Sequence, residues 1–279
     1  MDLKSKIILI AGPTASGKSK FAIQLAKKIN GEIINADSMQ VYKELKILTA
    51  RPNKIDQKKI KHHLYGIKSV KNDFSTGAWL KLVYKKIKEI RKKNKIPILV
   101  GGTGLYFKSL IDGLVKIPNI PKKFRNSIRS LQNILGQKKF YNKLLKLDPK
   151  IKNYVKKNDT QRSIRAFEIK KYTKLSIIDW FQKTKKIFDE DEFVKIYIDF
   201  PRHELLKRIA KRIDEMFKEN VVNEVVKFNR LNIKRDKSAN KVIGLEEISS
   251  YINGIHTIEE IKEKILIKTR QYAKRQMTW

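Results

Sequence analysis

The start of the chain holds a glycine-rich loop between an apolar run and a helical pattern. The run Ile7–Ala11 has strand character, and residues 12–19 fit the pattern G-x-x-x-x-G-K-[ST]. Apolar residues then recur at helical spacing: Phe21, Ala22, Leu25, Ala26 and Ile29. Asn30-Gly31 offers a helix stop. Strand, loop and helix in this order predict an α/β fold with a phosphate or diphosphate site at the start of the first helix.

The loop offers several kinds of phosphate contact. Gly12 and Gly17 let the backbone curl so that successive N–H groups point into one concavity, and the helix N-terminus adds its partial positive charge. Lys18 can reach the outer phosphates, and the hydroxyl of Ser19 can ligate Mg²⁺. The predicted phosphate-binding residues are Gly12, Pro13, Thr14, Ala15, Ser16, Gly17, Lys18 and Ser19. The motif leaves open which phosphate compound binds.

Composition narrows the class of protein. With 279 residues, 41% of them hydrophobic, the chain can bury a sizeable core. It has no cysteine, which excludes disulfides, thiol catalysis and cysteine-ligated zinc and fits a reducing compartment. No apolar stretch approaches a membrane span, and the N-terminal apolar run is too short for a signal peptide. We therefore expect a cytoplasmic protein without membrane contact, and we expect a monomer.

The formal net charge of +36 suggests a polyanionic partner. However, 51 of the 64 basic residues are Lys and only 13 are Arg, in a chain rich in Lys, Ile and Asn. A biased composition would give any surface this charge, so the total is weak evidence for nucleic acid. The placement of Arg is more informative, because its planar fork suits phosphate.

Two further turns follow predicted strands. The pattern of residues 32–37 predicts a strand that ends in Asp37, and functional residues of α/β sheets collect at such carboxyl ends. A helix cap or a solvated turn is the alternative for Asp37. The strand 96–100 runs into the glycine-rich turn 101–106, whose glycines suit close approach of the backbone to a ligand or to the first loop. That strand lacks the terminal Asp of an ordinary Walker B motif, which disfavours a standard ATPase motor.

The second half of the chain is mostly helical. Pro118 and Pro121 bracket a boundary, the pattern from 122 to 185 is helical, and a strand returns at 194–199. This late strand indicates that the helical block interrupts one sheet. We predict a core from 1–116, a helical insertion from 117–190, and a return to the core with C-terminal helices from 191–279.

Two pairs of arginines stand at helical spacing. Arg162 and Arg165 share a face of a helix that opens at Thr160, although a solvated basic face is the plainer interpretation. Arg208 and Arg212 lie on the polar side of a helix that starts near Arg202.

Five motifs, taken in order, resemble those of bacterial tRNA dimethylallyltransferases. They are GPTASGKS at 12–19, ADSMQVY at 36–42, GGTGLY at 101–106, NDTQRSIRAFE at 158–168 and TRQYAKRQMTW at 269–279. The first is shared with many kinases, whereas the ordered set is specific and spans nearly the whole chain. Members of this family transfer a dimethylallyl group from its diphosphate to N6 of the adenosine just 3′ of the tRNA anticodon.

The resemblance implies a P-loop NTPase-like parallel sheet core with an inserted all-helical domain that grips the anticodon stem-loop. It puts dimethylallyl diphosphate on residues 12–19 with Mg²⁺ at Ser19, and either Arg208 or Arg212 on the diphosphate. It makes Asp37 the base for the amine, with Lys18 and Thr103 as further catalytic residues. The implied tRNA contacts are Asp37, Ser38, Met39, Gln40, Thr103, Arg125, Gln161, Arg162, Ser163, Ile164 and Arg165.

The sequence departs from the family pattern in three places. Gly66 stands where family members usually carry Asp, and Leu245-Glu246 replaces an aromatic and a basic residue, which weakens any tRNA contact expected from 241–247. The chain also ends at Trp279, where the family usually continues.

Three other functions compete with this interpretation. They are isopentenyl transfer to free adenine nucleotides, phosphoryl transfer by a small-molecule kinase that uses ATP, and RNA binding without catalysis. The motif at 158–168 favours tRNA over the first two, and Asp37 beside an intact phosphate loop argues against the third.

Overall fold

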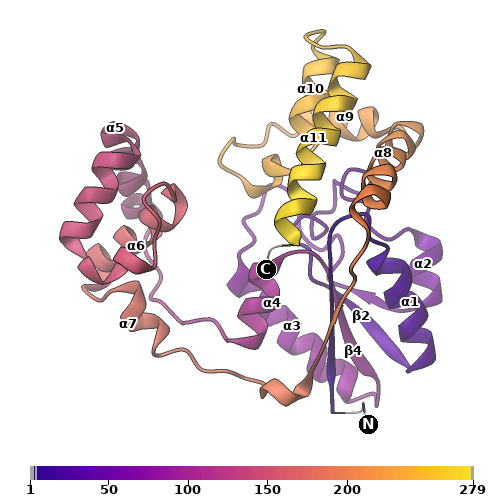
Figure 1. Ribbon diagram of the computed structural model, residues 1–279, viewed down its shortest axis with the longest axis horizontal. Helices are drawn as coiled ribbons and strands as arrows, with labels where there is room; N and C mark the ends of the chain where they lie inside the picture. The colour runs from indigo at the N-terminus through magenta and orange to yellow at the C-terminus, as the bar shows by residue number, and fades with distance from the viewer. Residues whose placement is uncertain (1–2, 4, 278–279) are drawn as a thin grey trace. The chain divides into compact units, whose positions relative to one another are not determined.

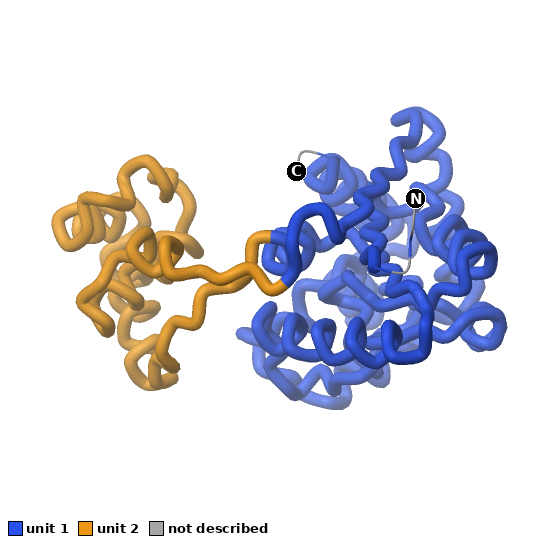
Figure 2. The backbone as a smooth tube through the Cα atoms, turned by 90° about the horizontal axis from the view of Figure 1, so that it is seen from below, with its two compact units in different colours: residues 1–111, 188–279 blue, residues 112–187 orange. Residues whose placement is uncertain are grey.

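The computed structural model describes residues 3 and 5–277, and the chain folds into two compact units (Figure 1, Figure 2). Residues 1–111 and 188–279 make up the core unit, and residues 112–187 make up the helical unit. The helical unit therefore starts at 112 and ends at 187, compared with the 117 and 190 expected from the prolines and the late strand.

The core unit is built on a five-stranded sheet in which every pairing is parallel and the strand order is β3-β2-β4-β1-β5. The strands are β1 Ile7–Ala11, β2 Gly31–Asn35, β3 His62–His63, β4 Ile96–Val100 and β5 Phe193–Tyr197. Leu9 of β1 pairs with Leu99 on one side and with Lys195 on the other. Because β5 adds to β1, the chain returns to the same sheet after the helical unit. The expected α/β class with a parallel sheet is confirmed.

The two faces of the sheet carry separate hydrophobic cores, because successive residues of a strand point to opposite sides. Ile7, Leu9, Ile34 and Leu99 pack with α3 (Thr76–Arg91) and α4 (Gly104–Ile111). The intervening residues, such as Ile8, Ile10 and Ile98, pack with α1 (Lys18–Lys28). Burial on both faces explains why these strands read as continuous apolar runs.

The expected apolar stripe of α1 is partly wrong. Phe21 is 37% exposed, whereas Ile23, which does not fit that spacing, is 9% exposed and packs against the sheet with Ala22 and Ala26. Leu25 and Ile29 also pack against this core, so the predicted stripe is confirmed except at Phe21, whose place Ile23 takes.

Of the remaining α-helices of the core unit, all but the short α2 share a third hydrophobic core. The remaining helices are α2 Lys54–Lys59, α8 Arg202–Lys218, α9 Val221–Asn229, α10 Leu245–Ile252 and α11 Ile258–Gln276. All but α2 pack around the loop that follows β2, through residues such as Val41, Leu45 and Leu48. Figure 1 shows α8 to α11 gathered at one end of the sheet. They thus cover the segment that continues from the carboxyl end of β2.

The helical unit has a core of its own. It contains α5 Lys122–Leu147, α6 Thr160–Thr173 and α7 Ile177–Phe181. At Gly136 the backbone leaves helical geometry with a φ of +67°, so α5 consists of two helical segments joined at a kink. Phe140, Leu144 and Phe167 are central to its hydrophobic cluster. Among the described residues of the whole chain, no helix is long and apolar enough to cross a membrane.

Candidate active site

The phosphate loop connects β1 to α1 in a strongly curved backbone. Gly12 has a φ of +148°, and a Cβ there would lie 2.7 Å from the carbonyl oxygen of Ile198, so the residue that follows β5 leaves room only for glycine. Gly17 has a φ of +90° and caps the N-terminus of α1. The loop therefore combines curved backbone with a helix N-terminus, as its sequence predicts.

Lys18 bends back over this loop, and its Nζ donates a hydrogen bond to the carbonyl oxygen of Pro13 at 2.5 Å. Burial lowers the pKa of Lys18 to about 8, the nearby carboxylate of Asp37 opposes that shift, and Arg212 adds to it. A bound diphosphate would favour the charged form of this amine, so the site is prepared for an anion.

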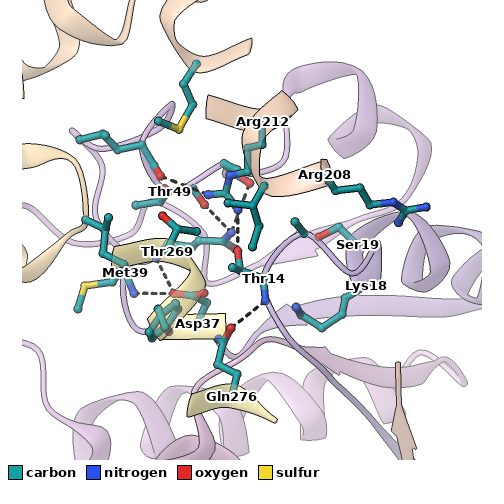
Figure 3. A pocket seen from close by; sticks show the side chains of 18 of the residues that line it. Thr14, Lys18, Ser19, Asp37, Met39, Thr49, Arg208, Arg212, Thr269 and Gln276 are labelled. Carbon is teal, nitrogen blue, oxygen red and sulfur yellow. Dashed lines mark hydrogen bonds between the residues drawn. The ribbon is translucent and has the colours of Figure 1, made fainter. Parts of the chain in front are cut away.

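A cavity of about 760 Å³ opens beside the loop (Figure 3). Its lining comes from separate segments of the core unit: the phosphate loop with the start of α1, residues 37–40, residues 48–50, Tyr65, residues 100–101, α8, residues 241–243 and α11. The cavity is polar at the phosphate loop. Its lining also includes apolar side chains, namely Leu48, Ile209, Ile213, Met216, Val242 and Ile265. A ligand with an anionic head group and a short apolar tail would match this combination of polar and apolar lining.

Asp37 lies in the wall of the cavity, two residues past the end of β2. Its Oδ1 accepts the backbone N–H of Met39 at 2.8 Å and that of Gln40 at 3.4 Å. Its own N–H donates to Oδ1 of Asn35, while the indole of Trp79 donates to the carbonyl oxygen of Asn35. The carboxylate is therefore held by a turn that is itself fixed to α3. Its charge also reaches Lys18.

Thr103 supports this turn from the second glycine-rich segment. Its Oγ1 accepts the N–H of Ser38 at 3.0 Å and donates to Oγ of Ser38 at 3.3 Å. Gly101 explains the close approach, because a Cβ there would lie 2.1 Å from the carbonyl oxygen of Ala36. Gly101 thus lets this turn meet the segment just after β2, and it also lines the cavity.

Gln276, at the end of α11, connects the two glycine-rich turns. Its Oε1 accepts the N–H of Thr14 at 2.8 Å, and its Nε2 donates to the carbonyl oxygen of Gly102 at 3.0 Å. The side chain is 5% exposed. Sequence reasoning missed this residue as part of the site. The signal was present, since Thr269, Tyr272 and Gln276 lie three and seven residues apart on one face of a helix.

The two arginines of α8 reach the loop in different ways. Nη1 of Arg212 donates to Oγ1 of Thr14 at 2.7 Å, and Nη2 donates to the carbonyl oxygen of Leu48 at 3.4 Å. Burial lowers the pKa of Arg212, and Asp37 opposes that shift. The guanidinium of Arg208 stacks 3.8 Å above the ring of Phe200, and a Cβ at Gly17 would lie 3.5 Å from its Nη1. Both side chains therefore border the phosphate loop.

The loop 46–51 closes another side of the cavity. The carboxylate of Glu224, on α9, accepts the N–H groups of Lys46, Ile47 and Leu48. Nη1 of Arg51 donates to the carbonyl oxygen of Tyr42 at 2.8 Å.

Two departures from the family pattern have structural reasons. A Cβ at Gly66 would lie 2.0 Å from Nη1 of Arg51, so the guanidinium of Arg51 occupies the space of a side chain at 66. Leu245 is buried in the core between α8 and α11, and Glu246 forms an ion pair with Lys268 at 3.0 Å. At these positions, Leu245 thus contributes to core packing and Glu246 to an ion pair at the surface.

The helical unit carries the remaining predicted contacts. Arg162 has a side chain that is 64% exposed and donates to Asp159, and the side chain of Arg165 is 43% exposed. Gln161 is exposed and Arg125 is partly buried. In contrast, Ser163 and Ile164 are buried. Ser163 forms hydrogen bonds with Asp159 and Gln137, and Ile164 belongs to the hydrophobic cluster of the helical unit. The helical unit itself covers their side chains, and their contact with tRNA stays a prediction.

Known proteins resemble this chain over nearly its full length. The sequence profile of the IPP transferase family matches residues 40–279. A tRNA dimethylallyltransferase of Pelagibacter ubique (strain HTCC1062) is 63% identical over 279 residues, which is 100% of this chain and 89% of that protein. A tRNA dimethylallyltransferase of Rickettsia massiliae (strain Mtu5) is 43% identical over 277 residues, which is 99% of this chain and 76% of that protein.

Solved structures agree. A tRNA isopentenylpyrophosphate transferase from Bacillus halodurans superposes with a TM-score of 0.68 at 34% identity, covering 99% of this chain and 86% of that one. A eukaryotic dimethylallyltransferase acting on tRNA superposes with a TM-score of 0.85 at 29% identity, covering 98% and 69%. The chain is therefore a P-loop-type prenyltransferase by fold. It belongs to the IPP transferase family, as the ordered motifs predicted.

Proposed function

We propose that this protein transfers a dimethylallyl group from dimethylallyl diphosphate to N6 of the adenosine 3′ of the anticodon in tRNA, releasing diphosphate. The observation that carries the proposal is a single cavity that holds a phosphate loop, the carboxylate of Asp37 and apolar side chains. A diphosphate, an amine to be deprotonated and a five-carbon group each have a matching surface there. The relatives' names supply the tRNA substrate.

Asp37 acts as the general base in this proposal. The amino group of adenine is a poor nucleophile, because its lone pair is delocalised into the ring. A carboxylate within hydrogen-bond reach can take the proton as the new C–N bond forms. Met39 and Gln40 hold Oδ1 through their N–H groups, which supports Oδ2 as the oxygen that accepts the proton. Thr103 is then a positioning residue, because it acts on Asp37 through the adjacent Ser38.

Departure of the diphosphate requires that its growing negative charge be stabilised. The backbone N–H groups of the loop and the amine of Lys18 provide this stabilisation. The N–H of Thr14 is used by Gln276 and that of Ser16 by the carbonyl oxygen of Pro13, so the cradle consists of the other N–H groups that follow in the loop. We assign the arginine contact to Arg208. Two nitrogens of Arg212 already donate to Thr14 and Leu48, whereas Arg208 stands beside the loop on the ring of Phe200.

The residues present fit a magnesium ion that is bound mainly through substrate oxygens. Ser19 is exposed on the first turn of α1 and lines the cavity, and its hydroxyl oxygen suits Mg²⁺. Among residues 3 and 5–277, no group of three or more His, Asp or Glu side chains could hold a metal. When bound, Mg²⁺ would neutralise charge on the leaving diphosphate.

The helical unit supplies the grip on the anticodon stem-loop in this proposal. Its exposed Gln161 and Arg162 and its half-exposed Arg165 stand at the start of α6, where planar forks can take phosphate oxygens. A site for the loop nucleotides is required, because the adenine must leave its stack to reach Asp37.

Mass spectrometry of tRNA nucleosides tests the proposal. Unmodified tRNA incubated with the protein, Mg²⁺ and dimethylallyl diphosphate should yield N6-dimethylallyladenosine at one position, 3′ of the anticodon. Free adenine nucleotides in the same mixture should stay unmodified. Prenylation of the nucleotides instead of the tRNA, or no prenylation of either, would overturn the proposal.

Replacing Arg208 by Ala should raise KM for the prenyl donor more than replacing Arg212 does, if the assignment of the arginine contact is right.

A further inference from the structure

A buried carboxylate lies among three arginines in the helical unit. Glu168, on α6, is only 3% exposed, and its Oε2 accepts a hydrogen bond from Nη1 of Arg165 at 3.3 Å. Arg125 and Arg129, on α5, interact electrostatically with the same carboxylate. We call Arg125, Arg129 and Arg165 the arginine cluster. Three positive charges around one negative charge leave an excess of two, so the cluster favours an anionic partner.

The packing of two helices explains why these groups converge. Arg125 and Arg129 are four residues apart and so share one face of the first half of α5. Arg165, Glu168 and Tyr172 follow each other at intervals of three and four along one stripe of α6. The ring of Tyr172 meets the ring of Phe124 with centroids 5.4 Å apart, which holds that stripe against the first turn of α5. The cluster is thus a property of the packed helix pair.

The hydrogen bonds of this cluster are incomplete in the described chain. Oε1 of Glu168 is buried and has no hydrogen-bond partner, and neither has the buried Nε of Arg125. Burial also raises the pKa of Glu168, against the opposing effect of the three arginines. A buried carboxylate with an unused oxygen is unfavourable for stability, so its presence in this cluster needs another reason.

Arg162 provides a contrast within the same helix. It donates to Asp159, the residue that caps α6, and this short-range pair needs no contact outside the first turn of the helix. Arg129 differs because its helix offers it no such acid: α5 contains no Asp or Glu within its 26 residues. The side chain of Arg129 is also exposed, so its guanidinium is accessible to a partner.

We infer that Arg129 binds a phosphate of the tRNA backbone together with Arg125 and Arg165, and that Glu168 is the positioning residue that holds this cluster in place. The inference rests on the proposed function, since it assumes that tRNA is the substrate. Phosphodiester oxygens accept the planar fork of arginine well, and such contacts position a protein on RNA without reading its sequence. The expected contact is therefore independent of base identity.

Binding of the full-length protein to an anticodon stem-loop, measured over a series of salt concentrations, tests the role of Arg129. Lys139→Ala is the matched control, because it removes one positive charge from an exposed position beyond the kink of the same helix. Arg129→Ala should weaken binding about fivefold at moderate salt and lower the slope of log Kd against log salt by about one. Lys139→Ala should leave that slope unchanged. Equal slopes for the wild type and Arg129→Ala would overturn the inference.

Glu168→Gln tests the positioning role, because simple charge counting predicts the opposite result. The substitution makes the protein more positive by one, so RNA binding would become tighter if Glu168 merely neutralised charge. A positioning role predicts an approximately threefold higher KM for tRNA with kcat unchanged at saturating tRNA, and partial recovery in Glu168→Asp. Tighter binding by Glu168→Gln would overturn the positioning role.

The wild-type protein separates this inference from the proposed function. If the wild type prenylates the stem-loop but Arg129→Ala binds like Lys139→Ala, only the arginine cluster is wrong. If the wild type neither binds nor prenylates the stem-loop, the proposed function fails and the inference fails with it.

Discussion

In the core unit, several polar contacts around the cavity join residues that are far apart in the chain, whereas in the helical unit the arginines of α6 pair with acids three residues away. The hydrogen bond between Thr14 and Gln276 spans 262 positions and that between Arg212 and Thr14 spans 198. Arg162 pairs with Asp159, and Arg165 with Glu168. Long-range contacts fix atoms to within fractions of an ångström, which chemistry requires. Local pairs suffice to present charge to a polyanion. Changes in the core unit should therefore act on the reaction, and changes in the helical unit on tRNA affinity.

Asp37→Asn should have the largest effect. Asn preserves the size of the side chain and one oxygen for the turn, but it cannot accept a proton at neutral pH. Loss of a general base lowers the chemical rate by about 10²–10⁴-fold, and we expect a fall of this size in single-turnover experiments. Binding of tRNA and of dimethylallyl diphosphate should change far less. A retained single-turnover rate with weaker tRNA binding would make Asp37 a residue that positions the adenine.

Lys18→Ala comes next. It removes a charge-assisted contact to the leaving group and should raise the activation free energy by about 2–4 kcal/mol. Turnover at saturating concentrations of both substrates measures this effect. Lys27→Ala, at an exposed position in the last turn of the same helix, is the control for loss of a positive charge and should behave like the wild type. Near wild-type turnover in Lys18→Ala would contradict the proposal that the diphosphate binds to this loop.

Gln276→Ala tests whether a contact between distant segments controls the chemistry. It leaves the N–H of Thr14 and the carbonyl group of Gly102 without their partner, which should lower kcat/KM for the prenyl donor roughly tenfold. Gln271→Ala, exposed on the same helix, should be neutral. Affinity for tRNA at saturating prenyl donor should not change. Loss of tRNA affinity alone would contradict the division of labour between the two units.

The pH dependence of kcat/KM should reveal Lys18. Its pKa is lowered to about 8, so the amine loses its proton as the pH rises through this value in the free enzyme. The protonated form is the one that attracts diphosphate. We therefore expect kcat/KM for dimethylallyl diphosphate to be insensitive to this group below about pH 7 and to fall about tenfold per unit above about pH 8. Lys18→Arg keeps the positive charge at all these pH values, so kcat/KM of this variant should not fall above pH 8. A fall that persists in Lys18→Arg would have to come from the titration of another group.

Arg162→Ala should give the smallest effect. Because Arg162 is an exposed residue, we expect tRNA binding to weaken about threefold and the salt slope to fall by about one, with kcat unchanged. Measuring tRNA binding at several salt concentrations checks this. An unchanged slope would mean that Arg162 serves only its pair with Asp159.

The sequence predicted the features that depend on short segments. The phosphate loop, the acid after β2 and the helix that starts near Arg202 are each encoded within about twenty residues, where hydrophobic period and turn chemistry can be read directly. The return of β5 to the sheet was also predictable, because an isolated late strand needs a partner. The name of the reaction came from the ordered motifs, which the relatives then confirmed.

Other features depend on the tertiary structure and could not be read in this way. The motif at 269–279 showed that α11 matters, but only the fold places Gln276 between Thr14 and Gly102. Likewise, Ser163 and Ile164 lie within a motif expected to contact tRNA, and their burial follows from how α6 packs in the helical unit. A motif identifies a segment with a function, whereas the packing of the fold determines which of its side chains are exposed.

The hydrogen bond from Thr14 to Gln276 has a consequence for biosynthesis. The phosphate loop is among the first parts of the chain to be translated, but its partner on α11 is added 262 positions later. At roughly 5–20 residues per second, this interval lasts about 13–50 s on a ribosome. During this time the loop lacks the contact that connects it to the turn at Gly102. A nascent or truncated chain that ends before Gln276 therefore has an unfinished phosphate loop, so, if the proposed diphosphate site is right, incomplete products should not compete with the mature enzyme for the prenyl donor.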